Sequence, residues 1–248
     1  MKLSHATLSA PGGRKVNEDA AQSLVLANAQ GCWVVADGLR GHGGGDVASN
    51  VAVHSVIAAY QDKPELSAEQ LGNMLALAHH AILQGQQNND RLSAMRSTVV
   101  VLMLQDAQAW WAHVGDSRLY HFANGLIVHQ TKDHSVPQVM VDTGDISADD
   151  IRHHEDRNRL TRSLGNNGKL RTTVLDHAVP VAGGDAFLLC TDGFWEFVTE
   201  ADMQATLAQS ATPADCTDWL AAMELILSGR APASHDNYTA TAVFVEAN

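Results

Sequence analysis

The stretch WVVADGLRGHGGGD, residues 33–46, joins an apolar run to a glycine-rich segment through one carboxylate, Asp37. The run Trp33–Ala36 is typical of a buried strand. Five glycines follow within eight residues, from Gly38 to Gly45, and glycine serves where the chain turns sharply or lets something approach closely. A buried carboxylate is costly unless it is paired or bound to a cation. The stretch therefore predicts a strand that ends at a site for a cation or an anionic ligand.

The composition is that of an ordinary globular chain with an acidic balance. Its 248 residues, 45% hydrophobic and 18% charged, favour one domain over residues 1–248. The 28 acids against 16 bases give a net charge of −12, which argues against a nucleic-acid partner. No run approaches the ~18 apolar residues of a membrane helix, and no signal-peptide core is present. With three widely spaced cysteines, we expect a cytoplasmic protein with no membrane partner.

Strand-like runs come in pairs separated by short polar turns, as in 23–27 with 31–36, 98–104 with 109–114, and 119–122 with 126–130. Such short connections predict antiparallel sheets, and further strands are expected at 172–175, 186–190 and 238–245. Helical patterns cover 46–60, 67–84, 133–143, 147–152 and 213–227. The segment 135–162 is more polar, which fits either a lid-like insertion or an ordinary surface excursion.

The pattern of an apolar run followed by an acid recurs along the chain. It ends in Asp116, in Asp192 and, less cleanly, in Asp236, while Glu18 and Asp19 stand just before another strand. Strand ends gather along one edge of a sheet, so these acids can converge. Converging carboxylates stay ionised together only around cations. Ligands that are all oxygen atoms favour Mg²⁺ or Mn²⁺ over zinc.

Two such ions would supply the positive charge that attracts a phosphate to this acidic protein. Paired ions ~3.5–4 Å apart can hold a hydroxide and clamp an in-line displacement at phosphorus. Arg14 is a candidate phosphate ligand, since a guanidinium can grip two phosphate oxygens; a plain surface arginine is the alternative. Other phosphate chemistries fit less well, because the chain has no GxxxxGK[ST], no GxSxG and no cysteine followed by arginine six residues on.

Eight motifs, which together span about nine-tenths of the chain, resemble those of a known family. In order they are R14-x-x-N-E-D19, V35-A-D-G-L-x-G-H42, S97-T98, H113-V-G-D-S-R-x-Y120, T131-x-D-H-S135, L160-T-R-S-L-G165, L189-C-T-D-G193 and D236-N-x-T239. The family is that of the metal-dependent Ser/Thr protein phosphatases of type 2C, PPM, in their compact bacterial form.

The resemblance implies an α+β fold, a four-layer αββα sandwich of two antiparallel β-sheets flanked by helix pairs. It implies hydrolysis of phosphoserine and phosphothreonine by attack of a metal-bridging hydroxide, with Mg²⁺ or Mn²⁺ as cofactor. Partners would be phosphorylated proteins and a cognate Ser/Thr kinase, and segment 135–162 would be the variable flap. Two alternatives stay open: a non-catalytic phosphatase-like regulatory module and a small-molecule phosphoesterase.

The resemblance also assigns metal ligands. Asp37 would bridge the two ions. Glu18 and the carbonyl of Gly38 would serve one ion, and Asp192 and Asp236 would serve the other.

Three further roles follow from the same motifs. Asp19 would hold metal-bound waters, and Arg14 would bind the substrate phosphate. Asp116, together with Asp192 and Glu196, matches a weaker third metal position.

Two positions depart from the family pattern. Arg40 stands where the bacterial motif has glycine, and it would either face solvent or add positive charge at the site mouth. Leu39 stands where some relatives place a histidine that acts as general acid. The proton for the leaving group would then come from metal-bound water or from His42.

Overall fold

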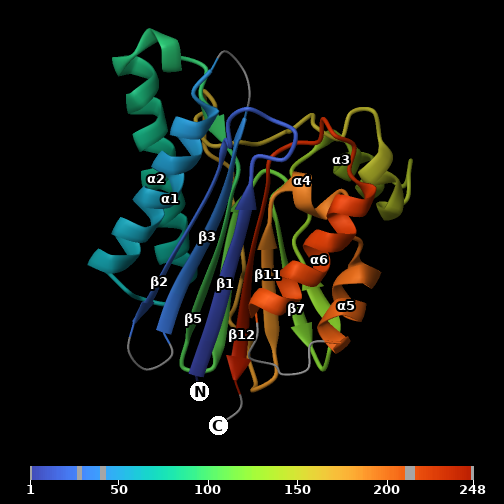
Figure 1. The fold of residues 1–248 in the computed structure, drawn as a ribbon. Coiled ribbons are helices and arrows are strands. Elements are labelled where there is room, and N and C mark those ends of the chain that lie inside the picture. Colours follow the sequence, from blue (N-terminus) through green and yellow to red (C-terminus); the bar gives the residue numbers. More distant parts are fainter. Residues whose placement is uncertain (1, 27–29, 40–42, 210–215, 247–248) are drawn as a thin grey trace.

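The computed structural model describes residues 2–26, 30–39, 43–209 and 216–246, which form two antiparallel sheets packed face to face (Figure 1). One sheet has the strand order β1-β12-β11-β7-β8, with β1 at Lys2–Ala10, β12 at Tyr238–Glu246, β11 at Ala186–Cys190, β7 at Arg118–Ala123 and β8 at Leu126–Gln130. The other has the order β10-β6-β5-β3-β2, with β10 at Val179–Pro180, β6 at Gln108–Val114, β5 at Val99–Gln105, β3 at Gln30–Leu39 and β2 at Asp19–Leu26. Two short strands complete it: β4 (Arg96–Ser97) pairs with β3, and β9 (Thr173–Val174) pairs with β6.

Helices cover the outer faces of both sheets (Figure 1). The second sheet is covered by α1 (Gly45–Asp62) and α2 (Ala68–Asn88), and the first by α5 (Glu200–Gln209) and α6 (Cys216–Arg230). The remaining helical elements are α3 (Val136–Thr143), α4 (Asp192–Trp195) and the 3-10 helices η1 (Asp90–Leu92) and η2 (Ala148–His153). None of the helices found in the described ranges is both long and apolar enough to cross a membrane.

The alternation of side chains along each strand produces the layers. Trp33 and Val35 of β3 face the first sheet, where they share a core with Phe187 of β11. Val34, between them, packs under α1 and α2 instead, because successive strand residues point to opposite faces. A third core fills the space between the first sheet and α6, centred on Trp219. Three cores between four layers confirm the predicted αββα sandwich.

Most predicted elements are confirmed, with bounds shifted by a few residues. Strand β1 was not predicted, because its only large apolar residues are Leu3 and Leu8; its backbone pairing along the whole of β12 makes it a strand. Strand β3 was expected to stop at Asp37 but continues to Leu39, since Gly38 and Leu39 pair with β4. Helix α3 begins only at Val136, because the side chain of Ser135 caps its N-terminus.

Two more predictions differ from the structure. The segment 147–152 is a 3-10 helix rather than an α-helix, and α5 was not predicted. His79 of α2 is buried, and its Nδ1 accepts a hydrogen bond from the backbone N–H of Gly165 at 3.1 Å. Ser67 caps the N-terminus of α2, since its Oγ accepts from the N–H of Gln70 at 3.1 Å. The Gln70 side chain, however, binds the carbonyls of Ala59 and Lys63 instead of completing a capping box.

Candidate metal and phosphate site

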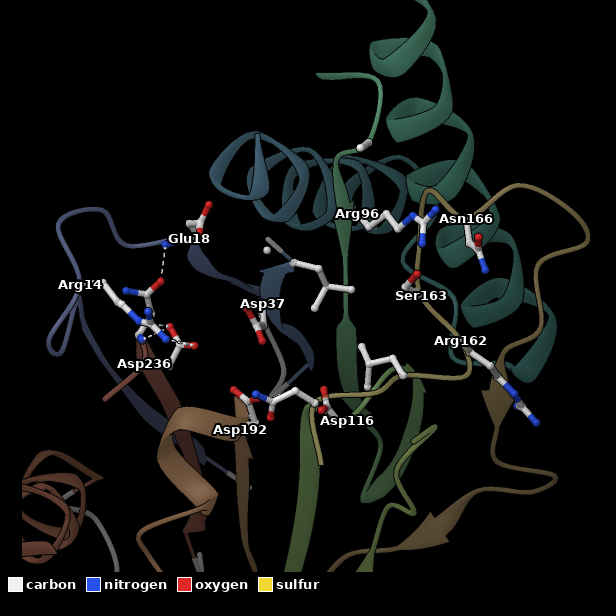
Figure 2. A pocket seen from close by; sticks show the side chains of 16 residues that line it. Arg14, Glu18, Asp37, Arg96, Asp116, Arg162, Ser163, Asn166, Asp192 and Asp236 are labelled. Atoms are coloured by element: carbon white, nitrogen blue, oxygen red, sulfur yellow. Dashed lines mark hydrogen bonds and ion pairs between the residues drawn. The ribbon is translucent and has the colours of Figure 1, made fainter. Parts of the chain in front are cut away.

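A cavity of about 660 Å³ lies at the ends of strands from both sheets. Seven of the eight predicted site residues line it: Arg14, Glu18, Asp37, Gly38, Asp116, Asp192 and Asp236. Figure 2 shows Asp37, Asp116 and Asp192 in the middle, Arg14 and Asp236 on one side, and Arg96, Arg162 and Asn166 on the other. The eighth residue, Asp19, lies directly across the ladder from Asp37, as its partner in the pairing of β2 with β3.

Strand pairing fixes the position of Asp37. Its backbone N–H donates to Thr98 Oγ1 at 2.9 Å, and its carbonyl accepts from the N–H of Thr98 at 2.8 Å and from Ser97 Oγ at 2.9 Å. Thr98 Oγ1 in turn contacts Ser117 Oγ at 2.7 Å, which ties the end of β3 to the turn that carries Asp116. The backbone N–H and carbonyl of Asp37 are thus both satisfied by Ser97 and Thr98, and the carboxylate lines the cavity.

Gly38 must be glycine because the chain crosses very close to it. A Cβ at this position would lie 2.1 Å from the carbonyl oxygen of Gly45 and 2.6 Å from that of Glu18. The N–H of Gly38 donates to this Glu18 carbonyl at 3.0 Å. The close approach predicted after Asp37 is therefore a contact between two segments of the chain, the end of β3 and the start of α1.

Asp19 and Asp192 are joined through a threonine. Thr191 Oγ1 donates to Asp19 Oδ2 at 2.9 Å and accepts from the N–H of Thr239 at 3.0 Å. Because Asp192 directly follows Thr191 at the start of α4, this contact links a carboxylate of the second sheet to one of the first. Thr191 is fully buried.

Asp236 and Arg14 form a two-pronged ion pair. Arg14 Nε donates to Oδ1 and Nη2 to Oδ2, both at 3.0 Å. Next to them, Asn237 Oδ1 accepts from the N–H of Glu18 at 2.9 Å, while its Nδ2 donates to the carbonyls of Pro11 and Val16. Asn237 thereby holds the loop that carries Arg14 and Glu18.

Burial and mutual repulsion make the cavity carboxylates difficult to ionise. Burial, followed by the charge of Asp192, raises the pKa of Asp37 well above its usual value. The pKa of Asp192 is raised in the same way, by burial and then by Asp116. Burial raises the pKa values of Asp19 and Asp116 to about 7. No side chain in the described ranges satisfies Asp116 Oδ1, which is buried without a hydrogen-bond partner.

This donor set fits hard divalent cations that keep part of their water shell. No three His, Cys, Asp or Glu side chains in the described chain converge closely enough to hold an ion by themselves, and the Glu18 side chain points away from Asp37 (Figure 2). Mg²⁺ and Mn²⁺, however, take carboxylate and carbonyl oxygens, and Mg²⁺ commonly binds through only one or two carboxylates and several waters. Several repelling carboxylates, one orphaned oxygen atom and a roomy cavity suit such ions.

Glu196, predicted to join the third metal position, does not line the cavity, and its Oε1 accepts from Arg157 Nε at 2.7 Å. Its charge nevertheless helps to raise the pKa values of Asp116 and Asp192. Asp116 and Asp192 do line the cavity. Arg40 and His42 lie outside the described residues, so the predictions about them stay predictions.

A family model described as protein phosphatase 2C matches residues 12–227. The chain belongs to this family. It is 33% identical over 211 residues to the serine/threonine phosphatase Stp of Listeria innocua, an alignment that covers 83% of this chain and 82% of the relative.

Solved structures give the same assignment. The Mycobacterium tuberculosis serine/threonine phosphatase PstP superposes with a TM-score of 0.83 at 27% identity, over 98% of this chain and 99% of that one. A catalytic domain of PstP in complex with two manganese ions superposes with a TM-score of 0.81 at 26% identity, over 98% of each chain.

Within this protein phosphatase 2C chain, several cavity residues were missed by the sequence reasoning. Asn237 was quoted in a motif but given no role, and its three hydrogen bonds depend on residues more than 200 positions away. Arg96, Arg162 and Asn166 also line the cavity. Their signal in the sequence is weak, because none of them follows a strand-like apolar run.

Proposed function

We propose that this protein is a metal-dependent phosphatase that hydrolyses phosphoserine and phosphothreonine in proteins. The observation that carries the proposal is the gathering of buried, mutually repelling carboxylates around one cavity beside Arg14. Membership of the protein phosphatase 2C family and the manganese-bound relative support it.

The proposed metal ligands are those inferred from the motifs. Asp37 would bridge two ions, with Glu18 and the Gly38 carbonyl on one side and Asp192 and Asp236 on the other. Bound Mg²⁺ or Mn²⁺ would supply an activated nucleophile and positive charge for an in-line displacement at phosphorus.

The chain's own residues would bind and orient the reactants. Arg14 would hold two phosphate oxygens through the same Nε and Nη2 donors that it directs at Asp236. Asp19, fixed by Thr191 and lying opposite Asp37, would accept a hydrogen bond from the attacking water. Asp116 would contribute to a weaker third ion, with Asp192 but without Glu196, because Arg157 already neutralises Glu196.

The surroundings of the site suggest its wider role. Segment 135–162 would be a flap, since Asn158, Leu160 and Arg162 at its end reach the cavity wall. Phosphorylated proteins would be the substrates, and a Ser/Thr kinase would be the opposing enzyme. The three cysteines are all buried free thiols, which suits the reducing cytoplasm.

The decisive experiment measures turnover of a phosphothreonine peptide and of an aryl phosphate with Mn²⁺, against an EDTA-treated sample and the variant Asp192→Ala. A matched control is Asp62→Ala, which removes an exposed acid at the end of α1, away from the cavity. We expect Mn²⁺-dependent turnover in the wild type and the control only. Equal turnover in the wild type and Asp192→Ala would refute the proposal.

Two further measurements separate the alternatives. A non-catalytic regulatory module should bind Mn²⁺ weakly in calorimetry, whereas the proposed site should bind it and lose binding in Asp192→Ala. A small-molecule phosphoesterase should hydrolyse nucleotides or sugar phosphates with a higher kcat/KM than phosphopeptides.

A further inference from the structure

A second hollow of about 320 Å³ continues from the catalytic cavity. The two share Arg162, Ser163 and Asn166 as common walls. Beyond these residues the hollow is lined by Lys169 and Arg171, and no acidic residue in the described chain lines it. We name Arg96 at the cavity mouth, Arg162, Lys169 and Arg171 the basic groove.

The basic groove is unusual in how its charges are placed. Of the seven arginines elsewhere in the described chain, all but Arg91 are paired with a carboxylate, namely Arg14, Arg118, Arg152, Arg157, Arg159 and Arg230. In the same described residues, none of the four groove cations has a carboxylate within 4.0 Å. On a chain with 28 acids and a net charge of −12, a row of unpaired cations beside the cavity concentrates positive potential at one place.

Backbone hydrogen bonds attach one side of the groove to β3, the strand that carries Asp37. Arg96 lies in β4, opposite Leu39 at the end of β3. The next residue, Ser97, exchanges two backbone hydrogen bonds with Leu164, at 2.8 and 3.3 Å, which attaches the loop that begins at Arg162. Arg96 and the start of the loop that carries Arg162 are therefore tied by hydrogen bonds to the strand that carries Asp37.

Helix α2 anchors the same loop from behind. Gln86 Nε2 donates to the carbonyls of Met95 and Gly165 at 2.7 and 2.8 Å. His79 accepts from the N–H of Gly165 at 3.1 Å. Gly165 has a φ of +75°, and a Cβ there would lie 2.5 Å from Ile82 of α2. Side chains projecting from this anchored loop can act as a preformed binding surface, which keeps the ordering cost of binding low.

We propose that the basic groove selects phosphoprotein segments that carry anionic side chains close to the phosphorylated serine or threonine. The inference rests on the proposed phosphatase function and adds the chemistry of its preferred substrates. A phosphate in the cavity would place neighbouring residues of an extended segment over Arg162, Lys169 and Arg171. Aspartate, glutamate or a second phosphorylated residue could supply the negative charge.

The test compares kcat/KM for four phosphothreonine peptides of one length. The first peptide has neutral flanking residues, the second has aspartate and glutamate, and the third has lysine. The fourth has neutral flanking residues and a second phosphorylated residue, a phosphoserine. We expect the acidic peptide to exceed the neutral one by roughly five- to tenfold, because a few exposed ion pairs contribute about 0.2–1 kcal/mol each. The doubly phosphorylated peptide shows whether carboxylates or phosphates are preferred. The acidic preference should shrink as salt is raised from low to physiological strength.

The variant Lys169→Glu/Arg171→Glu should abolish or reverse this ratio. Both side chains are exposed, so the variant should fold. The control Lys63→Glu/Arg91→Glu makes the same change in net charge at exposed positions outside the groove, and it should keep the wild-type ratio.

Each outcome is informative. If the neutral peptide is hydrolysed and the acidic one is no better, the groove inference is wrong and the phosphatase proposal stands. If both variants change the ratio equally, general electrostatics accounts for the preference and the groove does not. If no peptide is hydrolysed beyond the Asp192→Ala level, the phosphatase proposal fails. Fluorescence anisotropy in EDTA then tests the groove proposal separately. The proposal requires that the wild type bind the acidic peptide more tightly than Lys169→Glu/Arg171→Glu does.

Discussion

Asp116 and Asp133 are two buried carboxylates, 3% and 5% exposed, that the protein treats in opposite ways. Asp133 receives two hydrogen bonds of 2.8 Å from the guanidinium of Arg118, which also stacks over the ring of Trp195 at 3.5 Å. Asp116 lies only two residues before Arg118 in the chain, yet its Oδ1 has no partner in the described residues.

The difference separates a structural charge from a functional one. The region of Arg118 and Asp133 is neutralised from within, and Arg152 and Glu200 extend the same pairing. The cavity carboxylates repel one another instead, which costs stability unless cations arrive from solution. A site of this kind couples folding to metal binding, because an ion that binds only the folded chain stabilises it.

The largest expected effect concerns the unneutralised region. Asp37→Asn should lower Mn²⁺-dependent kcat by at least about 10³-fold, since several kcal/mol of charge stabilisation are lost. In EDTA, the same variant should unfold at no lower urea concentration than the wild type, because a neutral amide removes repulsion. Steady-state kinetics and urea denaturation measure the two effects. A variant that loses activity only because it unfolds would contradict the comparison.

The neutralised region should respond through stability. Asp133→Ala removes both short hydrogen bonds that neutralise the buried Arg118 and leaves it only a longer contact to a carboxylate of the described chain, Glu200, at 3.5 Å. The free energy of unfolding should therefore fall by about 3 kcal/mol. Urea denaturation in EDTA measures this change. Asp116→Ala is the matched control, and it should cost much less because Arg118 keeps both of its hydrogen bonds to Asp133 in this variant. Equal losses for the two variants would sink the distinction between the regions.

A pH dependence follows from His134, whose ring stacks on His113 at 4.4 Å. Burial, helped by His113, lowers the pKa of His134 to about 3. Below pH 6.5, His134 is therefore protonated in the unfolded chain but stays neutral in the folded chain. The free energy of unfolding falls as the pH falls. Between pH 7.5 and 5, this residue should account for up to about 2 kcal/mol of the decrease. Urea denaturation at both pH values should show a smaller loss of stability in His134→Asn than in the wild type. The amide oxygen of asparagine can replace Nδ1 as acceptor for the backbone N–H of Gly115.

The smallest effect is expected at Asp236, a cavity carboxylate that is paired with an arginine, Arg14, as Asp133 is. The side chains are 34% and 43% exposed, so the pair adds little to stability. Arg14→Lys should leave the urea midpoint nearly unchanged and lower kcat/KM for a phosphothreonine peptide by about tenfold, since lysine cannot grip two oxygens at once. A large loss of stability with unchanged kcat/KM would show that Arg14 serves the fold instead.

Much of the fold was predictable, because its signals are local. The turn at Asn124 and Gly125 joins β7 to β8 as expected, with φ values of +52° and +77°. Short connections led to the antiparallel sheets that the structure has. Strand β1 escaped prediction because an edge strand with few large apolar residues depends on its partner β12 rather than on its own pattern.

The sequence by itself determined which residue types stand at the strand ends, because apolar runs and turn residues favour strands and turns within a few positions of the chain. That is why seven of the eight predicted site residues line one cavity. Only the tertiary structure decided which charges are neutralised. Arg14 pairs with Asp236, 222 positions away in the chain, and Arg118 binds Asp133 rather than Asp116, which is nearer in the sequence. Four cations near the cavity form no ion pair with an acid of the described chain. Such pairings depend on distances in space and on burial, which no local pattern records.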